Sequence, residues 1–338
     1  MYFIEGSISM YDIIIIGAGP AGMAAAIYAA RSGNSVLIIE KSMVGGQIIY
    51  APKIKNYPAI SEISGYNFVM NMLNQAFSYG AKIVYEDVVS IIEQEYINEK
   101  KYKKVITNKN SYECKSIIIA IGLSKKKLNV TGESKYDGKG VSYCAICDGG
   151  FYKNKDVAVV GGGNTAVSDA IFLSNICGNV YIIHRKESFR AEKKLIESMD
   201  SIKNIHQILN ANVEEILGDE SVYGISVEVC ENRDENNKYN DKNKYKCRQK
   251  IDVQGVFIAV GQIPSEMDKN ENYKGITLDK DERGYILSDE NCKTNIEGIF
   301  VAGDIRKKEI RQLTTATSDG TIAALRAVEY VNNYYSVI

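Results

Sequence analysis

The sequence lacks an excess of charge and lacks long apolar runs. Its 338 residues carry 41 basic and 42 acidic side chains, a net charge of −1. Without a basic surplus, nucleic acid is not an expected partner. The longest apolar runs, such as 13–16 and 157–160, fall far short of the roughly 20 residues that cross a bilayer. We therefore expect no membrane insertion, and the length suggests about two domains.

Histidine is scarce, and most cysteines follow no spacing. Five of the seven cysteines are scattered along the chain without a repeating spacing: Cys114, Cys177, Cys230, Cys247 and Cys292. This distribution argues against the disulfide framework of a secreted protein. The first ten residues have no basic region of a secretory signal, so we expect a cytoplasmic protein. Cys144 and Cys147 form a Cys-x-x-Cys, which is redox-active or metal-binding. With only two histidines and no second such pair to complete a zinc site, redox chemistry is favoured and no metal is expected.

A glycine-rich turn, GAGPAG at residues 17–22, lies between the first apolar strand and an alanine-rich helix. Gly17 allows the tight turn, Gly19 lets the backbone approach a pyrophosphate, and Gly22 allows close helix–strand packing. The helix N-terminus then binds the diphosphate. Glu40 ends the next strand, at the interval where an acid meets a ribose hydroxyl, and it disfavours a 2′-phosphate. We predict a site for FAD or NAD.

The pattern recurs as GGGNTA at residues 161–166, where Ala166 replaces the third glycine. Its second strand ends not in an acid but in His184-Arg185-Lys186, with Arg190 further on. Arginine offers a rigid donor fork and lysine a point charge, so these cations suit a 2′-phosphate. We predict an NADPH site. The alternative is that the cations are a solvated helix start.

The remaining segments connect and complete these two nucleotide-binding units. We expect further strands at 82–95, 103–107 and 116–122. Residues 125–127 and 132–134 are predicted to be a linker. Eleven of the twenty residues from 231 to 250 are charged, so they cannot form a core and predict a polar hairpin loop.

Near the C-terminus a strand ends in Gly303-Asp304, which places a carboxylate where a ribityl or ribose hydroxyl could bind. A helix is predicted after Gly320, and its N-terminus could face an anion or an electron-rich ring. The alternative is an ordinary strand–turn–helix.

The order of motifs resembles the low-molecular-weight thioredoxin reductase family over nearly the whole chain. The motifs are GAGPAG, GGQ at 45–47, CAICDG at 144–149, GGGNTA, HRKESFRA at 184–191, VAGD at 301–304 and RQLTTATSDG at 311–320. Related flavoproteins share the nucleotide motifs but carry their cysteines elsewhere or lack them. The combination is therefore highly specific.

The resemblance implies an α/β fold with two Rossmann-like three-layer nucleotide-binding domains. An FAD domain, 1–123 and 253–338, is interrupted by an NADPH domain, 124–252, that carries the dithiol. A homodimer is implied, with domains that rotate to present nicotinamide and dithiol in turn to the flavin. The implied FAD contacts are Gly17, Gly19, Pro20, Ala21, Gly22, Glu40, Gly46, Gln47, Asn56, Gly122, Gly303, Asp304, Arg311, Gln312, Leu313 and Ala316. The implied NADPH contacts are Gly161, Gly163, Asn164, Thr165, Ala166, His184, Arg185, Lys186 and Arg190.

The family's reaction passes electrons from NADPH through FAD to the Cys144–Cys147 disulfide, and on to thioredoxin or a thioredoxin-like protein. The resemblance makes Cys147 the sulfur nearest the flavin, and which thiolate attacks the substrate stays open. Asp148 is implied as general acid and base. Its alternative is a turn residue in Asp-Gly-Gly. His184, at a strand end, is interpreted as structural rather than catalytic.

Three positions differ from the family's usual pattern. Lys186 replaces a second arginine, Ser168-Asp169 replace two glutamates, and Ile146 stands where a small polar residue is commoner. The first two bear on the electron donor, because some relatives use ferredoxin and have lost the nucleotide motifs. The retained motifs favour NADPH. The alternatives are a ferredoxin-dependent reductase or a flavin thiol oxidase on the same scaffold, or a non-enzymatic nucleotide-binding redox sensor.

Overall fold

The computed structural model describes residues 10–51, 53–97, 100–231, 245–266 and 275–335. The chain forms two compact units. Residues 1–124 and 263–338 make the first unit, and residues 125–262 make the second. Among the described residues, no helix is both long and apolar enough to cross a membrane.

The first unit is built on one large sheet in the order β3-β2-β1-β6-β5-β4, with β17 also pairing with β6. The strands are β1 (Tyr11–Ile16), β2 (Val36–Glu40), β3 (Lys82–Tyr85), β4 (Val88–Ile97), β5 (Lys100–Thr107), β6 (Ser111–Ile119) and β17 (Ile299–Val301). β3, β2, β1, β6 and β17 run parallel, whereas β4, β5 and β6 are antiparallel. The unit therefore combines a Rossmann-like parallel sheet with a β-meander.

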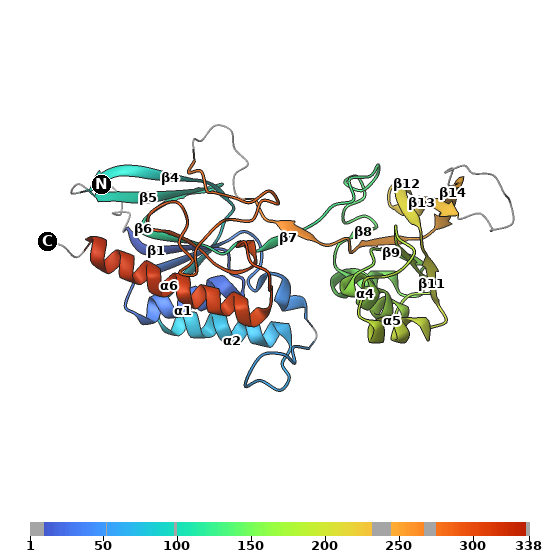
Figure 1. The fold of residues 1–338 in the computed structure, drawn as a ribbon, viewed down its shortest axis with the longest axis horizontal. Helices are drawn as coiled ribbons and strands as arrows, with labels where there is room; N and C mark the ends of the chain where they lie inside the picture. The colour runs from blue at the N-terminus through green and yellow to red at the C-terminus, as the bar shows by residue number, and fades with distance from the viewer. Residues whose placement is uncertain (1–9, 52, 98–99, 232–244, 267–274, 336–338) are drawn as a thin grey trace, which may run out of the picture. The chain divides into compact units, whose positions relative to one another are not determined.

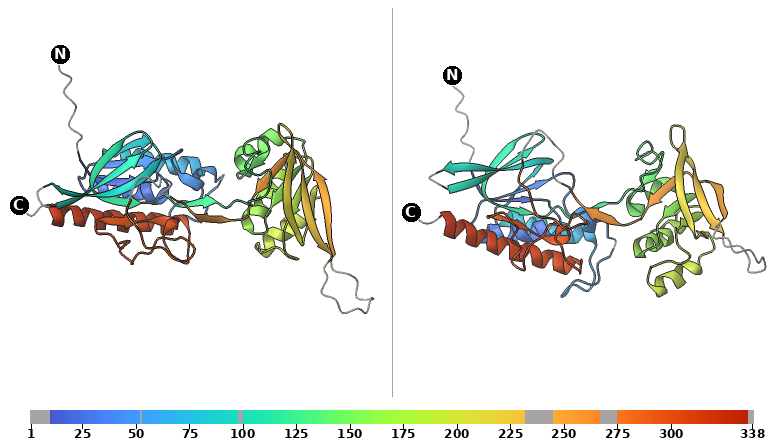
Figure 2. Two further views of the ribbon diagram at one scale, coloured as in Figure 1. Left: turned by 90° about the horizontal axis from the view of Figure 1, so that it is seen from above. Right: turned by 45° about the horizontal axis from the view of Figure 1, so that its top comes forward.

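Helices cover one face of the parallel strands, and β4 and β5, which continue the same sheet, pack over the other face (Figures 1 and 2). The helices are α1 (Pro20–Arg31), α2 (Gly65–Ser78) and α6 (Leu313–Tyr335), with the 3-10 turns η1 (Gly46–Tyr50) and η3 (Gly303–Ile305). Ile13 and Ile15 pack among the alanines of α1 and α6, while Ile14 and Ile16 belong to the core beneath β4 and β5. An unbroken apolar run suits β1 because both of its faces are covered.

The second unit has a parallel sheet in the order β11-β10-β9-β15-β8 and an antiparallel sheet, β12-β13-β14. Its strands are β8 (Val141–Ser142), β9 (Val157–Val160), β10 (Val180–Ile183), β11 (Ile205–Ile208), β12 (Ala211–Gly218), β13 (Val222–Glu231), β14 (Tyr245–Asp252) and β15 (Gly255–Ile258). Its helices are α3 (Ala145–Asp148), η2 (Gly149–Tyr152), α4 (Asn164–Ser174) and α5 (Lys193–Asp200). Val157 and Val159 pack against α4, and Ala158 and Val160 pack toward the antiparallel sheet. Helices, parallel sheet and antiparallel sheet thus form three layers.

The second unit ends at residue 262 rather than at 252, the boundary expected from the sequence. The reason is β15, which pairs with β9 and β8 inside the second unit's parallel sheet. The chain then continues through β16 (Gln262–Pro264), which pairs with β7 (Leu123–Lys125) as a separate two-stranded sheet.

The predicted linker around Gly132 is wrong. Glu133 is almost completely buried and accepts hydrogen bonds from the amides of Leu128 and Asn129, at 2.9 and 2.6 Å. It also accepts one from the Tyr143 hydroxyl at 2.7 Å. A buried carboxylate with three donors is a structural anchor, and a flexible connection would not supply them.

Two further expectations change at the ends of elements. α6 begins at Leu313, so Gly320 lies inside the helix and not before it. Gly320 is needed there because a Cβ would clash with the backbone of Ala21 on α1. The expected strand 82–95 is divided into β3 and β4. The arms of the predicted hairpin, β13 and β14, pair antiparallel as expected, but residues 232–244 of its loop lie outside the described residues.

Candidate active site

The first glycine-rich turn connects β1 to α1 at the edge where the parallel strands end. Gly17 has φ +100°, and a Cβ there would lie 2.5 Å from the carbonyl oxygen of Ala120 on the neighbouring chain segment. A Cβ on Gly22 would clash with the backbone of Gly17. Gly19 is the N-cap residue of α1, but it supplies no side-chain hydrogen bond to the helix, and the space at its Cβ position is open. The backbone N–H groups at this helix N-terminus can therefore bind an anion such as a diphosphate.

Glu40 lies at the end of β2, beside this turn. Its nearly buried carboxylate accepts hydrogen bonds from the amides of Ala18, at 2.8 Å, and Ser42, at 2.9 Å. Each carboxylate oxygen thus keeps further accepting capacity. Glu40 both fixes the turn and offers acceptors to a ligand hydroxyl.

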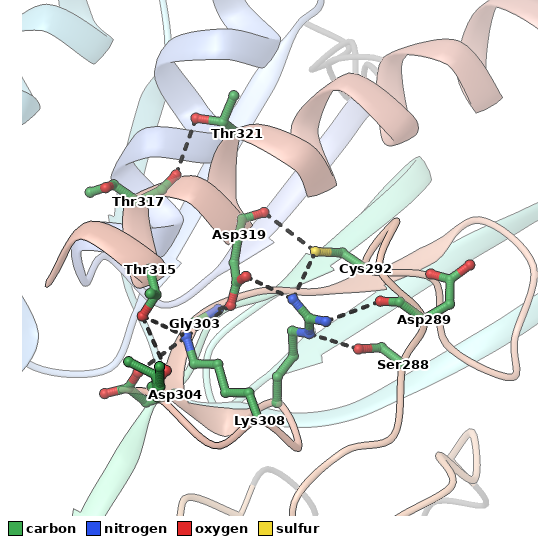
Figure 3. A network of polar contacts seen from close by, with 12 residues as sticks. Ser288, Asp289, Cys292, Gly303, Asp304, Lys308, Thr315, Thr317, Asp319 and Thr321 are labelled. Atoms are coloured by element: carbon green, nitrogen blue, oxygen red, sulfur yellow. Dashed lines mark hydrogen bonds and ion pairs between the residues drawn. The ribbon is translucent and has the colours of Figure 1, made fainter. Parts of the chain in front are cut away.

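Asp319 is the centre of a buried polar network behind Gly303 and Asp304 (Figure 3). Its carboxylate accepts a hydrogen bond from the Gly303 amide at 3.1 Å. It also forms ion pairs with Arg306 at 2.7 Å and Lys308 at 2.9 Å. Both cations and Asp319 are at most 12% exposed at their side chains. This network holds the turn that carries Asp304.

Asp304 has an oxygen that its neighbours leave available. Its Oδ1 is buried, lies 3.4 Å from Lys308 Nζ and has no hydrogen-bond partner among the described residues. A buried carboxylate oxygen without a hydrogen bond needs an explanation, and a ligand hydroxyl would satisfy it. The position therefore fits a ribityl hydroxyl.

The remaining predicted flavin contacts lie around the same edge of the first unit. Arg311 donates to the carbonyl of Asp304 at 3.3 Å. Gln312 at the start of α6 accepts from Asn56 at 3.3 Å, and Gln47 donates to the carbonyl of Leu123, next to Gly122, at 2.8 Å. Among the other predicted contacts, Pro20 and Ala21 lie on the first turn of α1, Gly46 begins η1, Leu313 begins α6, and Ala316 is buried on α6.

The second glycine-rich turn connects β9 to α4 in the same way. Gly161 has φ +154°, where a Cβ would clash with the backbone of Ala259. Gly163 caps α4 without a side-chain hydrogen bond, and the space at its Cβ position is open. Ala166 is fully buried, whereas the exposed Asn164 exchanges hydrogen bonds with Glu192 at 3.0 and 2.8 Å. Thr165 is exposed on the first turn of α4.

His184 lies directly after β10, close to this turn. Its ring is nearly buried against the backbone of Gly162 and stacks on Phe189. Burial, followed by the charges of Arg190 and Arg185, lowers the pKa of the imidazole. Its Nε2 is buried without a hydrogen-bond partner in the described part of the chain. His184 is therefore a neutral ring that supports the turn, and one nitrogen remains available to a ligand.

Arg185, Lys186 and Arg190 are exposed around this histidine. The Arg190 amide donates to the carbonyl of Gly162 at 2.7 Å, which ties the cationic segment to the glycine turn. Within the described ranges, no carboxylate forms an ion pair with any of the three cations. Their charges remain available to a ligand phosphate.

Cys144 and Cys147 form a disulfide at the N-terminus of α3. Cys144 is the N-cap residue, and its sulfur accepts a hydrogen bond from the Cys147 amide at 3.3 Å. Asp148 ends this one-turn helix, and its Oδ2 accepts from the Ser142 hydroxyl at 2.6 Å. The side chain of Asp148 is thus engaged with the strand that precedes the disulfide.

Four of the other cysteines, Cys114, Cys177, Cys247 and Cys292, are free thiols. Burial raises the pKa of Cys177 and of Cys292 to about 11, and raises that of the fully buried Cys114 further. These thiols stay protonated and unreactive near neutral pH. Cys247 is exposed on β14. Among the described residues, no group of three or more His, Cys, Asp or Glu side chains is placed to hold a metal ion.

Sequence reasoning missed two groups that the structure places at these sites. The side chains of Ser142 and Asp319 contact the predicted residues Asp148 and Gly303. Ser142 carried a signal, since a serine two residues before a Cys-x-x-Cys can reach its backbone. Asp319 lies in the motif RQLTTATSDG, but its ion-pair partners Arg306 and Lys308 precede that motif, so the motif alone did not reveal the network.

Comparison with known proteins gives a consistent result. The sequence profile of the family described as pyridine nucleotide-disulphide oxidoreductase matches residues 11–320. A thioredoxin reductase from Listeria innocua is 40% identical over 322 residues, 95% of this chain and 94% of that protein. One from Bacillus subtilis is 38% identical, covering 95% of each chain. The crystal structure of Lactococcus lactis thioredoxin reductase is 36% identical and superimposes with a TM-score of 0.81, covering 96% of this chain and 99% of that one.

Proposed function

The chain belongs to the low-molecular-weight thioredoxin reductases of the pyridine nucleotide-disulphide oxidoreductase family, and we propose that it carries electrons from NADPH through FAD to thioredoxin. The observation that carries the proposal is the Cys144–Cys147 disulfide on α3, the short helix that ends in Asp148. It lies in the same unit as the second glycine-rich turn. A nucleotide site and a redox disulfide in one unit suit a relay better than a passive switch.

We assign FAD to the first unit. Four features of the described residues fit it: the open, uncapped N-terminus of α1, the glycines whose Cβ atoms would clash, the acceptors of Glu40, and the buried oxygen of Asp304 without a hydrogen bond. The diphosphate would bind at Gly19, and the ribose and ribityl hydroxyls at Glu40 and Asp304. The family implies a flavin and a nicotinamide nucleotide.

We assign NADPH to the second unit, with its diphosphate at Gly163. Arg185, Lys186 and Arg190 supply cationic donors without ion-pair partners in the described chain, which favours a 2′-phosphate. His184 would present its Nε2 to the same nucleotide. Lys186 preserves the charge of the family's second arginine and gives up its bidentate donor fork.

When bound, the flavin accepts a hydride from the nicotinamide and supplies two electrons to a disulfide. The chain's own residues handle the sulfur atoms and the protons. As the Cys144–Cys147 bond breaks, each sulfur retains one of the two electron pairs involved, and Asp148 protonates the thiolate that leaves. The dithiol then attacks a substrate disulfide through a mixed disulfide, and the second cysteine closes the original bond, releasing a substrate dithiol.

We propose that the substrate is a protein. Two large apolar side chains stand exposed beside the disulfide: Ile146 is 41% exposed and Phe151 is 76% exposed. Exposed aromatic and aliphatic groups at a reactive centre suit contact with an apolar protein surface, as thioredoxin would provide. We propose a cytoplasmic location, because a reductase of dithiol carriers works in a reducing compartment. A homodimer is proposed from the family resemblance.

The test is an anaerobic titration of the purified yellow protein with NADPH and with NADH, followed by an assay with thioredoxin. We expect NADPH to bleach the flavin at lower concentration than NADH, and thioredoxin to be reduced. If neither nucleotide bleaches the flavin, a ferredoxin-fed reductase or a thiol oxidase replaces the NADPH assignment. Bleaching without reduction of any disulfide carrier would identify a redox sensor.

A further inference from the structure

Ser142 lies on β8, two residues before the redox disulfide, and its side chain is not assigned to any step above. The residue is only 4% exposed. Its hydroxyl donates to Oδ2 of Asp148 at 2.6 Å and accepts a hydrogen bond from the Cys144 amide at 3.0 Å. The Asp148 amide donates to the carbonyl of Cys144 at 3.1 Å. Ser142, Cys144 and Asp148 therefore form a closed ring of hydrogen bonds.

The Ser142 hydroxyl has a second acceptor within reach. The carbonyl oxygen of Cys144 lies 3.3 Å from the Ser142 oxygen, so the single hydroxyl hydrogen can point either to that carbonyl or to Asp148. A serine oxygen can accept two hydrogen bonds while donating one. When the Asp148 carboxyl carries a proton, the hydroxyl can turn to the Cys144 carbonyl and accept that proton's hydrogen bond.

Asp148 has few other side-chain ties in the described residues. α3 is a single turn, and one of its capping contacts, from the Cys147 amide to the Cys144 sulfur, depends on the sulfur that reacts. β8 is anchored independently, because Ser142 pairs with Phe257 of β15 and Val141 is buried. Ser142 thus connects Asp148 to a strand that the redox reaction does not touch.

We propose that Ser142 is a positioning residue for Asp148. It keeps the carboxyl beside the dithiol in both protonation states, donating to the carboxylate and accepting from the acid. The inference rests on the proposed function, in which Asp148 protonates a departing thiolate. It adds that one rotating hydroxyl on β8 maintains the geometry of that proton transfer through the redox cycle.

The test compares Ser142→Ala, Ser142→Thr and Tyr143→Phe as flavin-loaded enzymes. Tyr143→Phe is the matched control, since it removes a hydroxyl next to Cys144 whose partner is Glu133 and not Asp148. NADPH-driven thioredoxin reduction gives kcat and KM from pH 5.5 to 9, and stopped-flow bleaching by NADPH gives the flavin reduction rate. Tyr152 is a titratable side chain near Asp148 in the described residues, and burial, followed by the charge of Asp148, raises the pKa of its phenol.

For Ser142→Ala we expect kcat to fall about ten- to a hundredfold, the loss of one hydrogen bond to a charged group. The KM for thioredoxin and the rate of flavin bleaching should stay within about twofold. The basic limb of the kcat profile should move to higher pH, because the lost hydrogen bond favours the carboxylate over the acid. Ser142→Thr, which keeps the hydroxyl, should restore most of the activity and the original profile. Tyr143→Phe should change neither.

Three results would overturn the proposal: an unchanged kcat and profile in Ser142→Ala, an equal loss in Ser142→Thr, or the same change in Tyr143→Phe. The last two would indicate loosening of β8 and not a role of the hydroxyl. Failure of the proposed function would look different, because the wild-type enzyme would not reduce thioredoxin with NADPH at all.

Discussion

The Asp319 network offers a quantitative prediction for the flavin site. Asp319→Asn keeps the shape of the side chain and removes the charge that pairs with Arg306 and Lys308. Leaving buried cations without their carboxylate costs about 3 to 5 kcal/mol. We take the lower end, about 3 kcal/mol, because both cations keep other acceptors: Arg306 donates to Ser288 and to the Asp289 carbonyl, and Lys308 lies near Asp304.

At about 2 to 4 °C per kcal/mol for a unit of this size, the melting temperature of the first unit should fall by about 6 to 12 °C. Flavin affinity should fall about tenfold, since the amide of Gly303 loses a charged acceptor and its turn carries Asp304. Thermal unfolding and flavin fluorescence on release measure the two effects. Ser288→Ala, at the edge of the network, should cost about 1 kcal/mol or less. An Asp319→Asn protein with wild-type stability and flavin affinity would refute the account of this network.

Three further predictions concern the nucleotide sites and pH. Arg185→Ala should raise the KM for NADPH about ten- to a hundredfold and leave that for NADH within twofold, in steady-state assays; equal effects would contradict a 2′-phosphate contact. Gly22→Ala should yield protein without flavin, by absorbance ratio, because its Cβ clashes with the Gly17 backbone, whereas Gly150→Ala, with open space, should keep it. The lowered pKa of His184 means that the unfolded chain binds the proton more readily, so stability should fall as pH drops below about 6.5. Melting curves of His184→Gln should lose this dependence and those of the exposed His206→Gln should keep it; identical curves would contradict it.

The nucleotide-binding turns could be predicted from sequence because their requirements are local. Gly17 needs a positive φ, Gly22 needs to lack a side chain, and both demands follow from a strand that turns directly into a helix. The Cys-x-x-Cys is local in the same sense, since its two sulfurs are three residues apart on one helical turn. The prediction of two Rossmann-like units is confirmed, and it was possible because each unit begins with such a local glycine-rich turn between a strand and a helix.

The errors and omissions all involve tertiary partners. Gly132-Glu133-Ser134 has the composition of a loop, and only the three donors that surround Glu133 make it an anchor. Gly320 suggests a helix boundary until Ala21 of α1 is seen against it. The end of the second unit was placed too early because the partners of β15 cannot be read from its own apolar residues.

The central claim is that Cys144 and Cys147 relay electrons from the flavin to a protein disulfide. The most direct measurement follows flavin bleaching by NADPH and reduction of thioredoxin in parallel, for wild type, Cys144→Ser and Cys147→Ser. The account predicts that both variants bleach at the wild-type rate within about twofold. Neither should reduce thioredoxin, because the remaining cysteine has no partner with which to form the intramolecular disulfide that accepts electrons and releases the substrate. Sustained thioredoxin reduction by either variant would contradict the account.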